Sequence, residues 1–195
     1  MNGDNSLVYV VDDDPDLGPA VARLLCRHGF TAQSFLDPLL LLDIYAQAPA
    51  ACIVTDVMMD DLDGFGFADR IRAMDSGAAI IFMTAWPTTA NAVDSVRRHG
   101  GIDYLEKPLD EARLLAAVSE GVDWSSRRRR QLARTATLSP REREVFDLLV
   151  QGHSNKVIAG MLELSPKTVE DHRASIMFKT EANGLAQLIA LASLD

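Results

Sequence analysis

Acidic residues stand where short apolar runs end in the first half of the sequence. Asp12 and Asp13 follow one run and Asp56 follows another, while Thr84 and Lys107 follow two more. Three carboxylates at one place raise one another's pKa, and Mg²⁺, which prefers carboxylate, carbonyl and water oxygens, relieves that repulsion. A hydroxyl and an ammonium suit phosphoryl oxygens. These residue types indicate a phosphotransfer site with Asp56 as the nucleophile.

The apolar runs alternate with longer segments of helical periodicity. Such alternation predicts a doubly wound α/β domain, with a five-stranded parallel sheet and helices on both faces. The carboxyl ends of parallel strands share one rim, so the polar residues above should meet there. We expect strands at 7–11, 31–35, 51–55, 79–83 and 102–105, and helices at 17–28, 38–46, 65–74, 88–99 and from 111.

Charge divides the chain into three parts. Residues 1–123 carry 8 Lys and Arg against 20 Asp and Glu, residues 124–136 carry five Arg and no acid, and residues 137–195 carry 6 basic against 8 acidic side chains. We interpret 1–123 as one domain, 124–136 as a basic linker that follows the end of a helix, and 137–195 as a second domain.

The second domain has the pattern of four helices. Ser139, Pro140 and Glu142 form the signature of a helix start, and Ser165-Pro166 repeats it in part. A very short turn at Glu163-Leu164 separates two short helices, which is typical of a helix-turn-helix unit. The expected helices are 140–151, 155–162, from 166, and 185–194.

Composition argues against export and membrane insertion. The N-terminus lacks the basic and apolar pattern of an export signal, and no apolar stretch is long enough to span a bilayer. We therefore expect a cytoplasmic protein with no membrane partner. Cys26 and Cys52 both stand in apolar segments without metal-ligand spacing, which favours buried, reduced thiols.

Four motifs in the first domain resemble the signatures of response-regulator receiver domains. They are VVDDD at 10–14, TDVMMDDLDG at 55–64, MTA at 83–85 and DYLEKP at 103–108. The resemblance implies the strand order 2-1-3-4-5 and a Lys107-Pro108 bond that is often cis. It also implies roles: Asp56 accepts phosphate from a sensor histidine kinase, and Tyr104 is an aromatic switch. Mg²⁺ is held by Asp12, Asp13, Asp56 and the Met58 carbonyl, and the phosphoryl group by Thr84 and Lys107.

The second domain resembles the LuxR-type helix-turn-helix of the FixJ/NarL family. The motifs are LSPREREVF at 138–146, G-x-S-N-K-x-I-A at 152–159 and LSPKTVEDHRASIMFK at 164–179. The resemblance implies a double-stranded DNA operator as partner, with the helix that begins near Ser165 in the major groove. The expected DNA contacts are Lys167, Thr168, Arg173, Asn155, Lys156 and Lys179.

The acidic balance of residues 137–195 weakens phosphate attraction for one copy. We therefore expect two copies on one operator, the arginines at 127–130, or both, with a homodimer when the chain is phosphorylated. The resulting hypothesis is a transcription regulator, not an enzyme. One alternative is a phosphatase that uses Asp56 as nucleophile, which would need a second acid and a substrate cap. Another is an output module without phosphorylation, controlled by protein contact or by redox at Cys26 or Cys52.

Overall fold

A parallel sheet organises the first of two compact units. The computed structural model describes residues 7–86 and 98–192, and the chain divides into the units Met1–Arg127 and Arg128–Asp195. The order β2-β1-β3-β4-β5 and the parallel pairing confirm the predicted fold. The strands are β1 (Leu7–Val11), β2 (Thr31–Phe35), β3 (Cys52–Asp56), β4 (Ala79–Thr84) and β5 (Asp103–Glu106).

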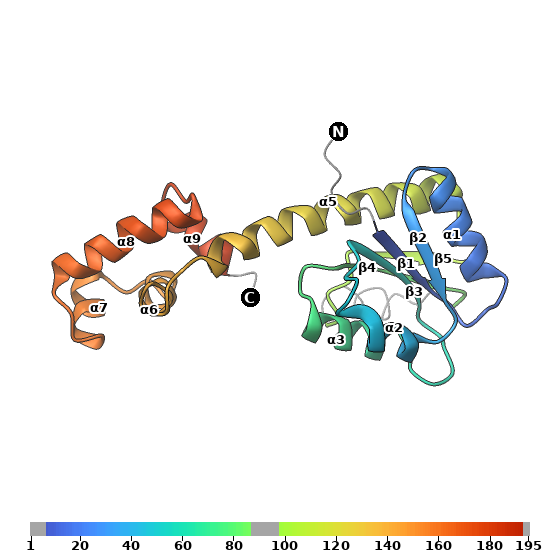
Figure 1. Cartoon of the computed structure of the whole chain (residues 1–195), viewed down its shortest axis with the longest axis horizontal. Coiled ribbons are helices and arrows are strands. Elements are labelled where there is room, and N and C mark those ends of the chain that lie inside the picture. Colours follow the sequence, from blue (N-terminus) through green and yellow to red (C-terminus); the bar gives the residue numbers. More distant parts are fainter. Residues whose placement is uncertain (1–6, 87–97, 193–195) are drawn as a thin grey trace. The chain divides into compact units, whose positions relative to one another are not determined.

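Helices cover both faces of this sheet (Figure 1). Residues of α1 (Leu17–Arg27) and α5 (Glu111–Ala136) pack on one face, and residues of α2 (Pro38–Tyr45) and α3 (Gly64–Met74) pack on the other. Every residue of β3 and β4 is buried, as expected for central strands that are covered on both sides. Most of the predicted helix 88–99 lies outside the described residues.

Helix α5 continues where the sequence led us to expect a linker. Residues 124–136 are helical throughout, because Arg, Gln, Leu and Ala favour helix even where the apolar pattern is weak. Contacts with the first unit also hold the start of this segment. The Ser125 hydroxyl donates to the Gly77 carbonyl at 2.6 Å, and the Arg72 guanidinium lies 5.4 Å from the centre of the Trp124 ring. The basic stretch is therefore part of a helix.

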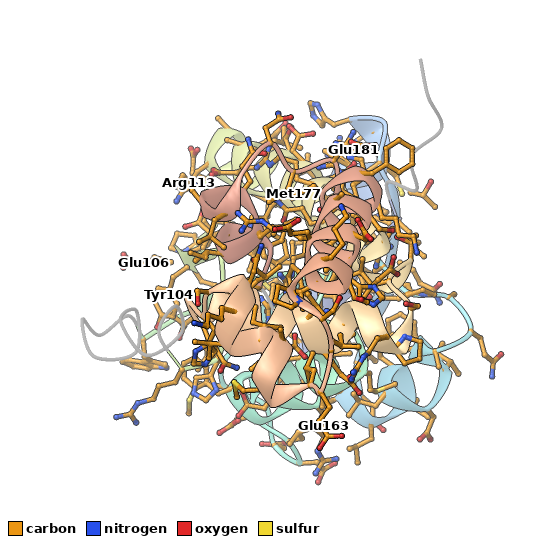
Figure 2. The ribbon with its side chains drawn as sticks, turned by 90° about the vertical axis from the view of Figure 1, so that its left-hand side faces the viewer. Tyr104, Glu106, Arg113, Glu163, Met177 and Glu181 are labelled. Carbon is orange, nitrogen blue, oxygen red and sulfur yellow. The ribbon has the colours of Figure 1, made fainter. Side chains whose placement is uncertain are left out.

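Four short helices follow in the second unit, as predicted. They are α6 (Pro140–Val150), α7 (Asn155–Met161), α8 (Pro166–Thr180) and α9 (Leu185–Ala192). Ser139 and Glu142 form the predicted capping box, and the Ser165 side chain caps α8. Glu163, in the turn before α8, and Glu181, directly after α8, have left-handed φ values of 54° and 53° and are labelled in Figure 2. The tight turn between α7 and α8 completes the helix-turn-helix.

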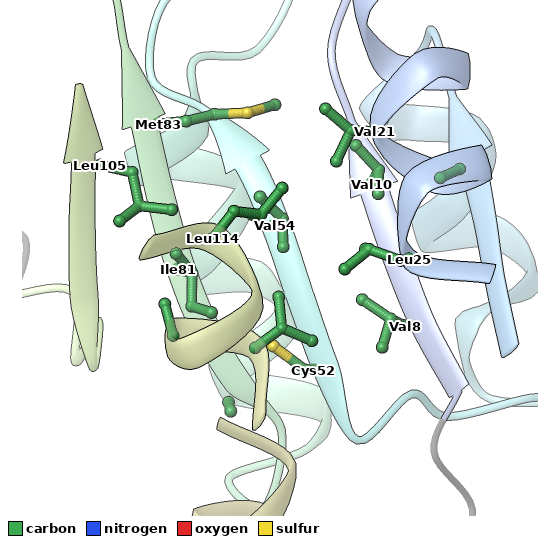
Figure 3. Packing of buried hydrophobic residues seen from close by; sticks show 14 residues of the cluster. Val8, Val10, Val21, Leu25, Cys52, Val54, Ile81, Met83, Leu105 and Leu114 are labelled. Carbon is green, nitrogen blue, oxygen red and sulfur yellow. The ribbon is translucent and has the colours of Figure 1, made fainter. Parts of the chain in front are cut away.

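Apolar packing explains why each unit is compact. Figure 3 shows the cluster between the sheet and the helices α1 and α5, with Val10, Val54 and Leu114 among its residues. Cys52 belongs to that cluster, and burial raises the pKa of its thiol to about 12. Cys26, in contrast, is exposed, so the expectation that both thiols are buried is wrong for this one. Its Sγ lies 3.5 Å from the carbonyl oxygen of Ala32 on β2.

Among residues 7–86 and 98–192, no helix combines the length and the apolar character that crossing a bilayer requires.

Candidate phosphoryl-transfer and nucleic-acid sites

Three predicted site residues meet at the carboxyl-terminal rim of the sheet. Asp12 directly follows β1, Asp56 is the last residue of β3, and Thr84 is the last residue of β4. Their exposed fractions are only 0%, 6% and 1%. Asp56 pairs with Met83 in the β3–β4 register, so Thr84 begins the turn beside it. Buried polar groups of this kind need partners.

Lys107 supplies the partner for both carboxylates. Its Nζ lies 2.8 Å from Asp12 Oδ2 and 2.5 Å from Asp56 Oδ2. Its backbone amide donates to the Thr84 carbonyl at 2.8 Å, and the Lys107-Pro108 bond is cis, as the resemblance implied. The lysine thus joins the ends of β1, β3 and β4 at one point.

Burial and charge act against each other in this cluster. Burial raises the pKa of Asp12, and the hydrogen bond from Lys107 offsets only part of this effect. Burial by itself would lower the pKa of Lys107, but the hydrogen bonds and charges of Asp12 and Asp56 outweigh it and raise that pKa above its ordinary value. Lys107 therefore carries a positive charge throughout the physiological pH range.

The acidic residues fit a divalent cation. Asp12, Asp13 and Asp56 each offer one oxygen, and these three oxygens lie within 4.8 Å of one another. Asp13 is exposed, so the cluster opens to solvent on its side. Hard oxygen ligands with an open side suit Mg²⁺, which binds through a few carboxylates and keeps several waters. The residues present thus match the predicted metal.

Backbone amides hold three further oxygens at this site. Asp56 Oδ1 accepts from the Met58 amide at 3.1 Å, and Asp12 Oδ1 accepts from the Asp14 amide at 3.0 Å. The Thr84 hydroxyl accepts from the Trp86 amide at 3.1 Å. Each oxygen therefore has a fixed direction before any ligand binds, which is the preorganisation that electrostatic stabilisation of a transferring group requires.

Tyr104 lies next to this cluster on β5. It pairs with Phe82 in the register of β4 and β5, and its ring packs against the apolar cluster that contains Phe82. Its hydroxyl is buried and has no hydrogen-bond partner among the described residues.

Gly64 is a site residue that the sequence did not single out. A Cβ at this position would lie 2.1 Å from the Asp56 carbonyl oxygen and 3.0 Å from Val57 Cα. The Gly64 amide donates to the Val57 carbonyl at 3.0 Å, which docks the start of α3 onto the end of β3. The backbone that carries Asp56 is therefore fixed by a contact that only glycine permits.

The predicted DNA contacts differ in how freely they face solvent. Lys156 and Lys167 are exposed, but Lys167 Nζ is paired with Asp171 Oδ1 at 2.9 Å. The Thr168 hydroxyl is engaged with Ser165 Oγ at 2.8 Å. Arg173 is half-buried, and its guanidinium reaches Asn155 Oδ1 at 3.3 Å. The surface of α8 is therefore already organised by contacts within the unit.

Lys179 has a partner that the sequence did not reveal. Its Nζ lies 2.6 Å from Glu142 Oε2, and Glu142 is only 5% exposed. The same carboxylate accepts from Ser175 Oγ at 2.5 Å and from the Ser139 amide at 2.7 Å. These contacts tie α8 to the start of α6, while the DNA contact expected of Lys179 stays a prediction.

Glu142→Gln is expected to destabilise the second unit by about 1–3 kcal/mol, because it weakens hydrogen bonds to a charged group. The hydrogen bonds from Lys179, Ser175 and Ser139 lower the pKa of Glu142 to about 2. Since the unfolded pKa is about 4.3, the charged form stabilises the fold above that pH and loses its effect as the pH falls toward 2. Hydrogen exchange of α6 and α8 amides measures both effects.

Glu144→Gln provides the matched control for Glu142. Glu144 lies two residues away, its side chain is 52% exposed, and its partner is Arg141. A surface ion pair contributes at most about 1 kcal/mol, so this variant should exchange like the wild type. Equal exchange rates in the two variants would contradict the assigned role of Glu142.

Comparisons with known families match both units. Residues 8–119 match the response regulator receiver domain family, and residues 136–192 match the bacterial regulatory proteins of the luxR family. Together the two matches leave only the ends of the chain and a stretch inside α5 uncovered.

Several relatives match this chain over nearly its whole length. Transcriptional regulatory protein FixJ of Bradyrhizobium diazoefficiens is 36% identical over 192 residues, which covers 95% of this chain and 93% of the relative. Tetrathionate response regulatory protein TtrR of Salmonella typhimurium is 34% identical over 188 residues, 93% of this chain and 89% of the relative. The solved structure of full-length FixJ from B. japonicum is 35% identical, with 96% of each chain covered and a TM-score of 0.57.

Proposed function

This chain belongs to the two-component response regulators that join a receiver domain to a LuxR-type DNA-binding domain, and we propose that phosphorylation of Asp56 controls its binding to DNA. It is a transcription regulator of the same kind as its FixJ relatives. The proposal covers four points. They are the residues that carry the signal, the metal that binds, the partners of the chain, and the domain limits 1–123 and 137–195.

One observation carries the proposal. A single ammonium, Lys107 Nζ, contacts both Asp56 Oδ2 at 2.5 Å and Asp12 Oδ2 at 2.8 Å. Asp56 can thus receive a phosphoryl group with a cation already beside its oxygen, while Asp12, Asp13 and Asp56 each offer one oxygen to a metal. If Asp56 had only a structural role, it would not need the carboxylates of Asp12 and Asp13 beside it at a site that opens to solvent.

This geometry suits transfer of a phosphoryl group from a phosphohistidine to Asp56. An Asp56 carboxylate oxygen attacks the phosphorus of a phosphohistidine, the bond between phosphorus and nitrogen breaks, and the imidazole takes the electron pair. Lys107 and the Thr84 hydroxyl then bind phosphoryl oxygens, so Lys107 must release part of its present contacts. Mg²⁺, bound by Asp12, Asp13, Asp56 and the Met58 carbonyl, would supply charge neutralisation between the carboxylate and the phosphoryl group.

A groove next to Lys107 suits the phosphodonor. It has a volume of about 440 Å³ and lies between α1 and the start of α5, with Leu17, Leu24, Pro108 and Leu109 in its lining. An amphipathic helix fits an apolar groove of this type. We therefore assign it to the helix of a sensor histidine kinase that carries the phosphohistidine.

Movement of Thr84 toward the phosphoryl group connects the site to the output. Thr84 would leave its contact with the Trp86 amide, and Tyr104, whose hydroxyl has no partner among the described residues, would turn inward. Figure 2 shows Tyr104, Glu106 and Arg113 on the same side of the first unit. We propose that a second copy pairs at this edge and that two copies then bind one operator in the cytoplasm.

Acetyl phosphate with Mg²⁺, followed by intact-mass measurement of the full chain, tests this proposal. The wild type should gain one phosphoryl group, and Asp56→Asn should gain none. Removal of Mg²⁺ with a chelator should prevent the gain in the wild type as well. The matched control is Asp60→Asn, an exposed acid four residues further on, which should be labelled like the wild type.

The same measurement separates the alternatives. Continuous release of phosphate, with no lasting adduct, would indicate a phosphatase. Absence of any adduct would indicate an output module without phosphorylation. Labelling of Asp56→Asn to the same extent as the wild type would place the acceptor elsewhere and overturn the assignment of Asp56.

A further inference from the structure

The solvent-facing stripe of α8 determines what this helix can present to DNA. Lys167, Asp171, Ala174 and Phe178 are all exposed, and their spacing of four, three and four residues places them on one helix face. Glu170 is exposed beside this stripe. We call these five residues the outer stripe of α8. The opposite face packs in the core of the second unit, where Val169, Ile176 and Thr180 are buried.

Hydrogen-bond acceptors dominate the outer stripe. It contains two carboxylates and one ammonium, and that ammonium, on Lys167, is paired with Asp171 at 2.9 Å. The Glu170 carboxylate has no hydrogen bond or ion pair within the described part of the chain, so it is available to a ligand. Ala174 adds only a methyl group and leaves room for a base edge to approach.

Two of the donors that the sequence suggested for DNA contact, Arg173 and Thr168, lie beside this stripe and have partners within the unit. The Arg173 guanidinium contacts Asn155 at 3.3 Å, and the Thr168 hydroxyl contacts Ser165 at 2.8 Å. Arginine reads guanine through the O6 and N7 acceptors, which requires a free guanidinium fork in the groove. The outer stripe offers acceptors instead, and acceptors cannot pair with the guanine edge.

Carboxylates in the major groove select amino groups. Cytosine presents its N4 amino group there, and glutamate and aspartate accept from it, whereas adenine presents an N6 amino group next to an N7 acceptor that repels a carboxylate. Phosphates also repel a carboxylate, so these side chains weaken binding to any duplex that offers no donor. Carboxylates on the outer stripe therefore favour cytosine and disfavour non-specific binding.

From this surface we infer that Glu170 and Asp171 are specificity-determining residues, which accept hydrogen bonds from cytosine amino groups in each half of the operator. The inference rests on the proposed DNA binding, and it names the hydrogen bonds by which α8 would recognise the base sequence of the operator. Lys167 then keeps Asp171 in place and offsets its charge near the phosphates.

Selection from a random duplex pool tests the inference. The full chain, treated with acetyl phosphate and Mg²⁺, retains DNA that is then sequenced, for the wild type and for Glu170→Ala, Asp171→Ala and Asp147→Ala. Asp147 is an exposed acid on α6 and provides the control for loss of one negative charge outside the outer stripe. Far-UV circular dichroism of each variant shows whether the fold is kept.

The wild type should enrich a C·G pair at fixed positions in each half-site. Glu170→Ala and Asp171→Ala should each lose discrimination at one such position, by on the order of tenfold to a hundredfold, while preferences elsewhere remain. Asp147→Ala should enrich the same sequences as the wild type.

Two results would overturn the inference, and they differ from failure of the proposed function. If both stripe variants enrich the same sequences as the wild type, the carboxylates are not read-out residues, although DNA binding stands. If all three variants bind every sequence more tightly than the wild type does and keep its sequence preferences, the acids act through charge alone. If the wild type retains no DNA with or without acetyl phosphate, the proposed DNA binding fails, and the inference fails with it.

Discussion

Gly64→Ala is expected to destabilise the first unit by about 3 kcal/mol or more and to abolish labelling of Asp56 by acetyl phosphate. The added Cβ would lie 2.1 Å from the Asp56 carbonyl oxygen, and the neighbouring atoms are backbone atoms that cannot rotate away. Either the start of α3 or the end of β3 must move, and overpacking of this kind is costly. Hydrogen exchange of the β3 amides and intact mass after acetyl phosphate measure the two effects.

Gly160→Ala is the matched control for this substitution. Gly160 lies on α7, and nothing within 4 Å would meet an added Cβ there. Alanine is a better helix former than glycine, so the second unit should become slightly more stable and labelling should be unchanged. Normal labelling of Gly64→Ala would show that the contact between α3 and Asp56 does not position the acceptor.

Lys107→Met is expected to lower the free energy of unfolding of the first unit by about 3 kcal/mol in the absence of divalent cations. Methionine keeps much of the side-chain volume but removes the ammonium that joins Asp12 and Asp56, whose side chains are 0% and 9% exposed. Loss of one partner leaves buried charge uncompensated. The stability of β1 and β3, measured by hydrogen exchange, should fall accordingly.

Mg²⁺ should restore much of that loss, because a cation bound by the same carboxylates replaces the missing charge and stabilises the folded state by mass action. Lys167→Met is the control, since it breaks an ion pair whose side chains are 76% and 66% exposed, so its stability should stay close to that of the wild type. A Lys107→Met variant as stable as the wild type without Mg²⁺ would contradict the view that the lysine compensates the acidic cluster.

The rim of the sheet could be predicted from the sequence because local patterns determine it. β1 begins and ends at the predicted residues, since its apolar run is followed directly by acids. β2 lies at 31–35, where a strand was expected to fill the gap between two helices. The acids and Thr84 follow apolar runs, and the ends of parallel strands necessarily share one rim. Asp12, Asp56 and Lys107 therefore meet as expected.

Contacts between distant elements could not be predicted in this way. Lys179 and Glu142 are 37 residues apart, and Arg173 and Asn155 are 18 apart, so their pairing depends on how the helices pack. The same limit applies to Thr180, a polar residue in the core of the second unit. It is fully buried and its hydroxyl donates to the Ile176 carbonyl at 2.7 Å within its own helix, so the core accommodates it.

Trp86 is placed so that its intrinsic fluorescence can report on the site around Asp56. The indole is 75% exposed and follows Thr84 by two residues, and the Trp86 amide donates to the Thr84 hydroxyl at 3.1 Å. A ligand that draws that hydroxyl away would break this hydrogen bond, and we expect the backbone and the indole of Trp86 to shift with it. Its fluorescence emission can therefore follow the chemistry at Asp56 in real time, without an attached dye.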